Sequence, residues 1–167
     1  QRVGVLIDVQ NLYYSARNLY QARVNFEEIL KLGVSKRNLI RAFAYVVRTK
    51  TGEEKPFFEA LTKLGIETRI RDLQEFYGGQ KKADWDVGIV IDAIRMAPSV
   101  DTLVIASGDG DFIALVEYLK NQGKRVEVIA FGRSSSNQLK EVADEFIDLE
   151  TAFAKYLLKS NKQEVKK

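Results

Sequence analysis

The feature that most constrains the fold is a set of short apolar runs that alternate with segments of helical pattern. Runs rich in β-branched residues cover residues 3–7, 39–47, 102–107 and 125–131, and the first of them ends in Asp8. Uninterrupted apolar runs of this length are typical of strands that are buried on both faces of a parallel sheet. The alternation therefore predicts an α/β domain with a mainly parallel sheet and right-handed crossovers.

The segments between these runs predict helices at residues 11–20, 25–30, 53–64, 84–96, 112–121 and 137–143. In the helix at 84–96, an apolar stripe should face the core; it consists of Val87, Val90, Ile91 and Ile94. Residues 66–73 alternate in polarity and predict a strand near the sheet edge, and residues 76–82 contain two glycines and predict a loop. A short strand at 146–147 should be followed by a last helix to about residue 158.

The chain has 167 residues, which suits one globular domain at 1–158 with a frayed basic tail at 159–167. It contains neither cysteine nor histidine, which excludes disulfides, thiolate nucleophiles, histidine bases and zinc sites of the Cys/His type. The absence of cysteine is typical of a cytoplasmic protein, which is the location we expect, and no apolar run is long enough to span a membrane. Any metal chemistry would depend on carboxylates, whose hard oxygen atoms suit Mg²⁺ or Mn²⁺.

Aspartates from three segments are expected at one edge of the sheet. Asp8 ends the first strand, and Asp109 and Asp111 follow the strand at 102–107, so all three lie at the carboxyl ends of strands. Asp86 lies in the first turn of a helix that leads into that same strand, which returns it to the same edge. Ligands of open parallel sheets bind at this edge, where the strand order reverses. Together these carboxylates predict a site for a divalent cation that activates water for attack on a phosphodiester.

Each aspartate alone has a structural alternative. Asp109 or Asp111 could simply cap the following helix, and Asp86 could interact only with the helix dipole. Asp92 lies about 120° around its helix from Asp86, so it either reaches the site from another angle or makes a structural hydrogen bond, and we favour the site.

Three motifs in this order resemble the NYN domains of the LabA-like group, relatives of the PIN-domain nucleases. They are Ile7-Asp-Val-Gln-Asn11, Lys82-Ala-Asp-Trp-Asp-Val87 followed by Asp92, and Ser107-Gly-Asp-Gly-Asp-Phe112, and the likeness spans residues 3–149. The resemblance implies a three-layer α/β/α sandwich with a mainly parallel sheet of five or six strands, Mg²⁺ or Mn²⁺ in an acidic pocket, and cleavage of RNA. Matched position by position, it implies acidic ligands at Asp8, Asp86, Asp92, Asp109 and Asp111, with Asn11 and Ser107 in support. It gives Asp84 no firm role.

Several residues are candidates for contacts with a nucleic acid. The net charge of +3 and the pI near 9.0 permit a polyanionic partner without requiring one. Lys81 and Lys82 precede the Asp86 helix, and Arg133 follows the strand at 125–131 on the same sheet edge. Tyr13 or Tyr14 could stack on a base, and one of the two should belong to the core. Arg48 and Lys50, at the end of the second strand, are weaker candidates; Ser136 or Asn137 is expected to cap the helix at 137–143.

Three functions are compatible with these residues. The leading hypothesis is a metal-dependent endoribonuclease that acts on RNA, with a homodimer as one option for its assembly. The second is a non-catalytic RNA-binding or regulatory module that retains the acidic pocket. The third is a phosphohydrolase, against which the chain has no Gly-rich phosphate loop and no second acid two residues after Asp8.

Overall fold

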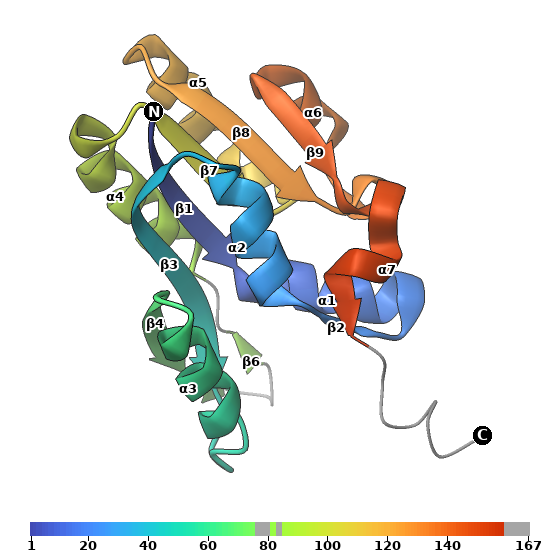
Figure 1. Cartoon of the computed structure of the whole chain (residues 1–167). Helices are drawn as coiled ribbons and strands as arrows, with labels where there is room; N and C mark the ends of the chain where they lie inside the picture. Colours follow the sequence, from blue (N-terminus) through green and yellow to red (C-terminus); the bar gives the residue numbers. More distant parts are fainter. Residues whose placement is uncertain (76–80, 83–84, 159–167) are drawn as a thin grey trace.

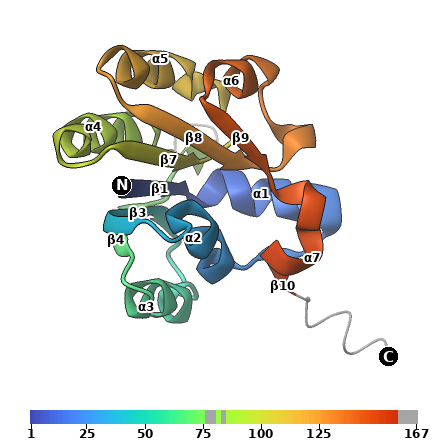
Figure 2. The ribbon, with the colours of Figure 1, turned by 45° about the horizontal axis from the view of Figure 1, so that its top comes forward.

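A sheet of six parallel strands between two layers of helices forms the centre of the molecule, as Figure 1 and Figure 2 show. The computed structural model describes residues 1–75, 81–82 and 85–158. All neighbouring strands in this sheet are parallel. In spatial order the strands are β4 (Glu67–Asp72), β3 (Asn38–Arg48), β1 (Arg2–Asp8), β7 (Thr102–Ala106), β8 (Arg125–Ala130) and β9 (Glu145–Asp148). The sandwich expected from the sequence is confirmed, and β4 lies at the sheet edge as predicted.

The strand order reverses at β1. From β1 the chain moves outward through β3 to β4, and then crosses back to β7 on the other side of β1 before continuing to β8 and β9. The ends of β1 and β7 are level, because Ile7 is paired with Ala106. At such a reversal, the loops after the two central strands lead to opposite sides, and ligands of open α/β sheets bind in the crevice between them.

Helices cover both faces of the sheet and enclose two hydrophobic cores. One face carries α1 (Val9–Tyr20), α2 (Phe26–Val34), α3 (Lys55–Lys63) and α7 (Phe153–Tyr156). The other face carries α4 (Asp86–Met96), α5 (Ile113–Asn121) and α6 (Asn137–Val142). Val5 and Ile7 contribute to the first core and Leu6 to the second, which is the alternation that a strand buried on both faces requires. Within the described residues, no helix combines the length and apolar character needed to cross a membrane.

Local signals fixed several helix ends as the sequence predicted. Asn25 caps α2, and its side-chain oxygen accepts a hydrogen bond of 3.4 Å from the backbone N–H of Glu28. Ser136 caps α6 in the same way, accepting from the N–H of Leu139 at 3.3 Å. Gly65 follows α3 with φ of 83°, a left-handed conformation that glycine adopts without strain.

The predicted apolar stripe of α4 is wrong. The side of α4 that packs on the sheet carries Ile89, Ala93 and Met96, together with Asp92. Val87, Ile91 and Ile94 are instead 69%, 43% and 41% exposed, and Val90 is half-buried. The helix contains apolar residues on more than one side, so periodicity alone did not identify the side that the sheet covers.

The last helix is also shorter than predicted. After β9 the chain forms a 3-10 turn, η4 (Leu149–Ala152), and then α7, which is only four residues long. Leu157 and Leu158 form β10, which pairs antiparallel with β2 (Arg23–Val24) instead of extending the helix. The predicted tail at 159–167 lies outside the described residues. Within the predicted loop, β6 (Lys81–Lys82) pairs with β5 (Gln74–Glu75), and residues 76–80 lie outside the described part.

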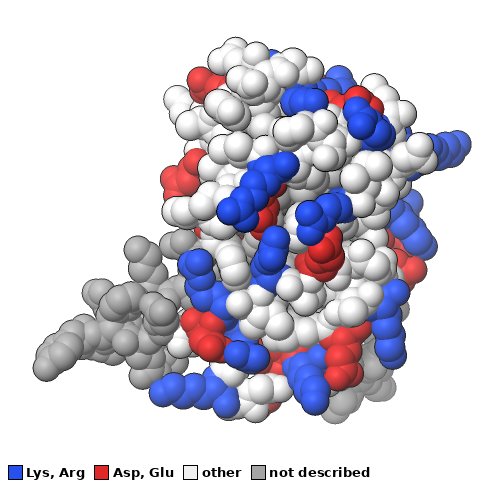
Figure 3. Space-filling view, turned by 90° about the vertical axis from the view of Figure 1, so that its left-hand side faces the viewer, with Lys and Arg blue, Asp and Glu red and all other residues white. Residues whose placement is uncertain are grey.

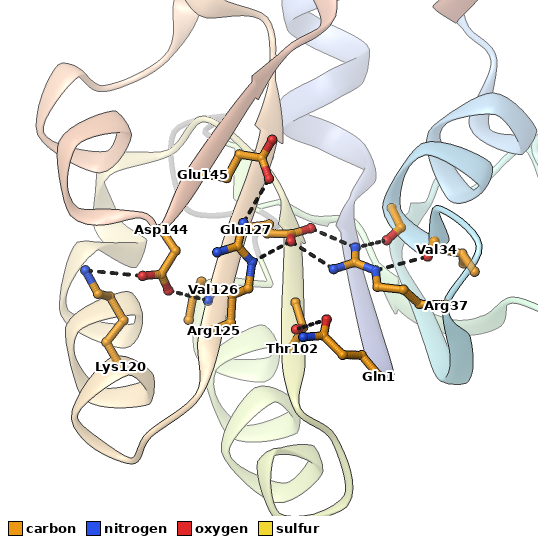
Figure 4. Close-up of polar contacts among 11 residues, drawn as sticks. Gln1, Val34, Arg37, Thr102, Lys120, Arg125, Val126, Glu127, Asp144 and Glu145 are labelled. Atoms are coloured by element: carbon orange, nitrogen blue, oxygen red, sulfur yellow. Dashed lines mark hydrogen bonds and ion pairs between the residues drawn. The ribbon is translucent and has the colours of Figure 1, made fainter.

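A buried ion pair lies near the amino ends of the strands, at the opposite edge of the sheet from the carboxylates. The Glu127 carboxylate, in a residue only 3% exposed, accepts bonds of 2.9 and 2.8 Å from the Arg37 guanidinium and of 2.9 Å from Arg125 (Figure 4). Burial raises the pKa of Glu127, but the bonds from Arg37 and Arg125 more than offset this and hold the pKa below its usual value. Glu127 is therefore a charged structural group that ties β8 to the segment before β3.

Candidate metal centre

Three carboxylates from separate elements meet in the crevice. Asp8 is the last residue of β1, Asp109 follows β7, and Asp86 is the first residue of α4. One oxygen atom from each lies within 4.8 Å of the others. The geometry of the parallel sheet produces this meeting, because β1 and β7 end side by side and α4 begins at the same edge.

The Asp8 side chain is held by two hydrogen bonds. Its Oδ1 accepts from the backbone N–H of Asn11 at 3.3 Å, and its Oδ2 accepts from the Ser107 hydroxyl at 3.0 Å. Asp8 is 9% exposed, so these donors replace part of the solvation that burial removes. The carboxylate thus has a fixed orientation at the start of α1.

The loop after β7 is fastened to the same group of residues. The Ser107 hydroxyl oxygen accepts a bond of 3.2 Å from the Asp109 N–H, and the Asn11 side-chain oxygen accepts one of 2.9 Å from the Gly108 N–H. A Cβ atom on Gly108 would fall on the side chain of Ser135, so only glycine allows this close approach of the two loops. Asn11 and Ser107, predicted as supporting residues, therefore lie beside the carboxylates and connect the ends of β1 and β7.

Asp109 combines the two roles that the sequence left as alternatives. Its Oδ1 accepts a bond of 2.9 Å from the Asp111 N–H and caps the 3-10 turn η2 (Gly110–Phe112), and one of its carboxylate oxygens lies in the group of three. Asp111 itself is exposed and lies outside that group. Asp84 lies outside the described residues.

Asp92 is placed away from the three carboxylates. One of its oxygen atoms accepts from the Tyr45 hydroxyl at 2.8 Å, and the Arg69 guanidinium donates to both oxygens at 3.1 and 3.3 Å. The residue is only 8% exposed. Burial, and then the bond to Asp92, raise the pKa of Tyr45, so its hydroxyl remains a donor. The structure thus gives Asp92 the structural hydrogen bonds that the sequence offered as the alternative to a place in the site.

The predicted substrate contacts fall in different surroundings. Arg133 is occupied by Glu150, to which its Nε donates at 2.6 Å and its backbone N–H at 2.8 Å. Tyr13 and Tyr14 are 42% and 51% exposed, so the expectation that one of them belongs to the core is wrong. Their rings lie 5.3 Å apart, edge to face, on the surface of α1. The side chains of Lys81 and Lys82 lie outside the described part of the structure.

The sequence did not single out Arg71 and Trp85, which lie next to the site. Trp85 immediately precedes Asp86 in the chain. Its indole N–H donates to the carbonyl of Val46 at 2.9 Å. The guanidinium carbon of Arg71 lies 4.4 Å from the centroid of the Trp85 ring, in cation–π contact. The alternation along β4 could have pointed to Arg71 from the sequence. Arg69 and Arg71 are two residues apart, and therefore lie on one face of the sheet.

The donor set fits a hard divalent cation. Carboxylate oxygens are the ligands that Mg²⁺ and Mn²⁺ take from proteins, and the described residues around the site offer no softer ligand because the chain has neither cysteine nor histidine. Three carboxylates so close together repel one another, and a bound cation removes this repulsion. The arrangement therefore favours occupancy by a divalent cation.

Comparisons with known proteins identify the family and the fold of the chain. The NYN domain family model matches residues 2–150. The chain is 26% identical over 163 residues to the "Low amplitude and bright protein LabA" of Synechococcus elongatus, covering 89% of this chain and 83% of LabA. An uncharacterized protein of Methanocaldococcus jannaschii is 30% identical over 97 residues, or 57% of this chain and 36% of that protein. A crystal structure of a Vibrio parahaemolyticus protein of unknown function superposes with a TM-score of 0.86 at 32% identity, covering 95% of this chain and 96% of that one.

Proposed function

Because the chain belongs to the NYN domain family, a PIN-like nuclease family, we propose that it is a divalent-metal-dependent endoribonuclease. The observation that carries the proposal is the meeting of Asp8, Asp86 and Asp109 within 4.8 Å at the carboxyl edge of the sheet. These three residues would hold Mg²⁺ or Mn²⁺. When bound, such an ion lowers the pKa of a coordinated water and neutralises charge that develops on the phosphodiester.

The residues around the carboxylates keep them ready for this role. The Ser107 hydroxyl and the Asn11 N–H fix the orientation of the Asp8 carboxylate, and the Asp111 N–H holds the Asp109 carboxylate. Asp111 is exposed one residue beyond Gly110, where it could accept a proton or orient a water without being a direct ligand. We assign Asp92 no direct contact with the ion, since Tyr45 and Arg69 occupy its oxygens.

Substrate contacts are proposed on the same edge of the sheet. Tyr13 is exposed on α1, two residues beyond Asn11, and its ring can stack on an unpaired base. Arg71 presents a guanidinium beside Trp85, next to Asp86, and can contact a phosphate. Such contacts favour single-stranded RNA, whose bases are open to stacking.

The test is cleavage of a circular single-stranded RNA, which only an endonuclease can open. The wild-type protein should cut it with Mn²⁺ or Mg²⁺ and not with EDTA, and Asp8→Asn and Asp109→Asn should reduce the rate at least 100-fold. Asp148→Asn is the matched control, because Asp148 also ends a strand at this edge but lies outside the group of three. Undiminished cutting by Asp8→Asn would refute the assignment. Tight RNA binding without cleavage in any metal would instead identify a binding module.

A further inference from the structure

Three β-branched side chains form an exposed ridge along α4, made of Val87, Ile91 and Ile94. They are 69%, 43% and 41% exposed, and their spacing of four and three residues places them on one side of the helix. The opposite side of α4 is buried on the sheet. Figure 3 views the molecule from the side on which α4 lies in Figure 1, and uncharged surface there separates small groups of charged residues.

The exposed Val and Ile side chains of this ridge do not stabilise the isolated chain. Val and Ile are weaker helix formers than Lys, Glu or Gln, because their branched Cβ loses rotamer freedom in a helix. Exposed in water, they gain no burial to compensate for this. Single exposed apolar residues are ordinary, but neighbouring ones on one helix face mark a contact surface.

The two ends of the ridge carry opposite charge. At the amino end, the exposed Asp111 lies in η2, which contacts α4. At the carboxyl end, Arg95 is exposed in the last turn. A surface that is apolar in the middle, acidic at one end and basic at the other is complementary to itself when a copy is turned end to end.

We propose that this ridge is the interface of a homodimer in which the α4 helices of two copies pack antiparallel about a twofold axis at Ile91. Ile91 then contacts Ile91 of the second copy. Arg95 lies over Val87 of the second copy, so that its stem covers apolar surface and its guanidinium reaches toward Asp111.

The size of the ridge sets the expected affinity. An α-helix of 11 residues is about 16 Å long, which is short for an interface, since stable ones bury about 800 Å² on each partner. We therefore expect a dimer with a dissociation constant in the micromolar range that weakens with salt. The two metal centres, one in each copy, lie at opposite ends of this dimer. Arg95 of the other copy lies beside each of them. This inference does not depend on nuclease activity.

Mass and cross-linking test the proposal together. Light scattering should show a mass rising toward twice 19.0 kDa with increasing concentration, and Ile91→Glu should remain at 19.0 kDa with an unchanged circular dichroism spectrum. Since the chain has no cysteine, single-cysteine variants report one position each. A short bismaleimide should join Ile91→Cys into a covalent dimer, and Ile70→Cys, 41% exposed on β4, is the matched control, which should not be cross-linked.

The charged ends provide a second test of orientation. Arg95→Asp should weaken the dimer at least 10-fold, and adding Asp111→Arg should restore it, because the attraction is then reversed in both halves of the interface. A mass of 19.0 kDa at every concentration overturns the proposal. So does a dimer that survives Ile91→Glu, or one in which Ile70→Cys is cross-linked as well as Ile91→Cys.

Discussion

Replacing Asp8 with asparagine should stabilise the protein in EDTA and abolish its stabilisation by metal. The reason is that the three carboxylates in the crevice repel one another when no ion is present. Oxygen atoms of Asp8, Asp86 and Asp109 lie within 4.8 Å of one another, and Asp8 takes part in two of the three pairs. Asparagine has nearly the same shape and keeps one oxygen for the N–H of Asn11. It therefore removes the charge with little change in packing.

The magnitude follows from Coulomb's law at this separation. Two unit charges 4.8 Å apart interact by about 3.5 kcal/mol at an effective dielectric constant near 20, and by about 1 kcal/mol in water. Asp86 and Asp109 are half-buried, so the lower part of this range applies to each pair. The altered hydrogen bond to Ser107 costs about 1 kcal/mol. We expect a net gain of about 1–3 kcal/mol, and each kcal/mol raises Tm by about 2–4 °C in a chain of this size.

Thermal unfolding in EDTA and in Mn²⁺ measures both effects. The wild type should gain about 2.7 kcal/mol when the Mn²⁺ concentration is 100 times the dissociation constant, whereas Asp8→Asn should gain nothing. Asp148→Asn is the control, because Asp148 also ends a strand and accepts two backbone N–H bonds of 2.9 Å, from Gly132 and Glu150, but has no place among the three carboxylates. That variant should lose stability in EDTA and keep the response to Mn²⁺. The reasoning fails if Asp8→Asn is destabilised in EDTA as much as Asp148→Asn, or still responds to Mn²⁺.

Other predictions concern structural contacts. Glu127→Gln should lower the free energy of unfolding in urea by about 2–4 kcal/mol, because it leaves the largely buried Arg37 with a weaker partner. Glu67→Gln removes a pair with the same bond lengths that is about half exposed, and should cost less than about 1 kcal/mol. The pKa of Glu127 is lowered in the folded protein, so the stability lost in Glu127→Gln should be greatest above about pH 4.5 and should disappear as the pH falls through the folded pKa. Equal losses for both variants at pH 7 would contradict the argument. Gly88→Ala should displace the Trp85 ring, which a Cβ would meet at 2.5 Å, and shift the fluorescence of this single tryptophan; an unchanged spectrum would show that the ring accommodates the methyl group.

Strong local patterns made much of the fold predictable. The buried runs that became β1, β3, β7 and β8 are apolar whichever strand lies beside them, so their assignment did not require the partners to be known. The helix caps at Asn25 and Ser136 are equally local, because each side chain bonds to an N–H three residues along the chain. The shortness of α7 was not predictable in this way, since the pairing of β10 with β2 involves residues more than 130 positions apart.

Residue content alone restricts any metal chemistry here to carboxylate ligands, and the pattern of apolar runs places Asp8 and Asp109 at the carboxyl edge of a parallel sheet. Chain direction and strand periodicity are local properties, and they place the end of every parallel strand on the same side. Which acids meet depends on the tertiary packing. The sequence left Asp92 open between the site and a structural hydrogen bond and favoured the site, yet Tyr45 and Arg69, brought alongside by β3 and β4, bind its oxygens. The exposed side of α4 was likewise decided by how the helix is rotated on the sheet. That rotation depends on packing against distant residues, which no pattern within the helix contains.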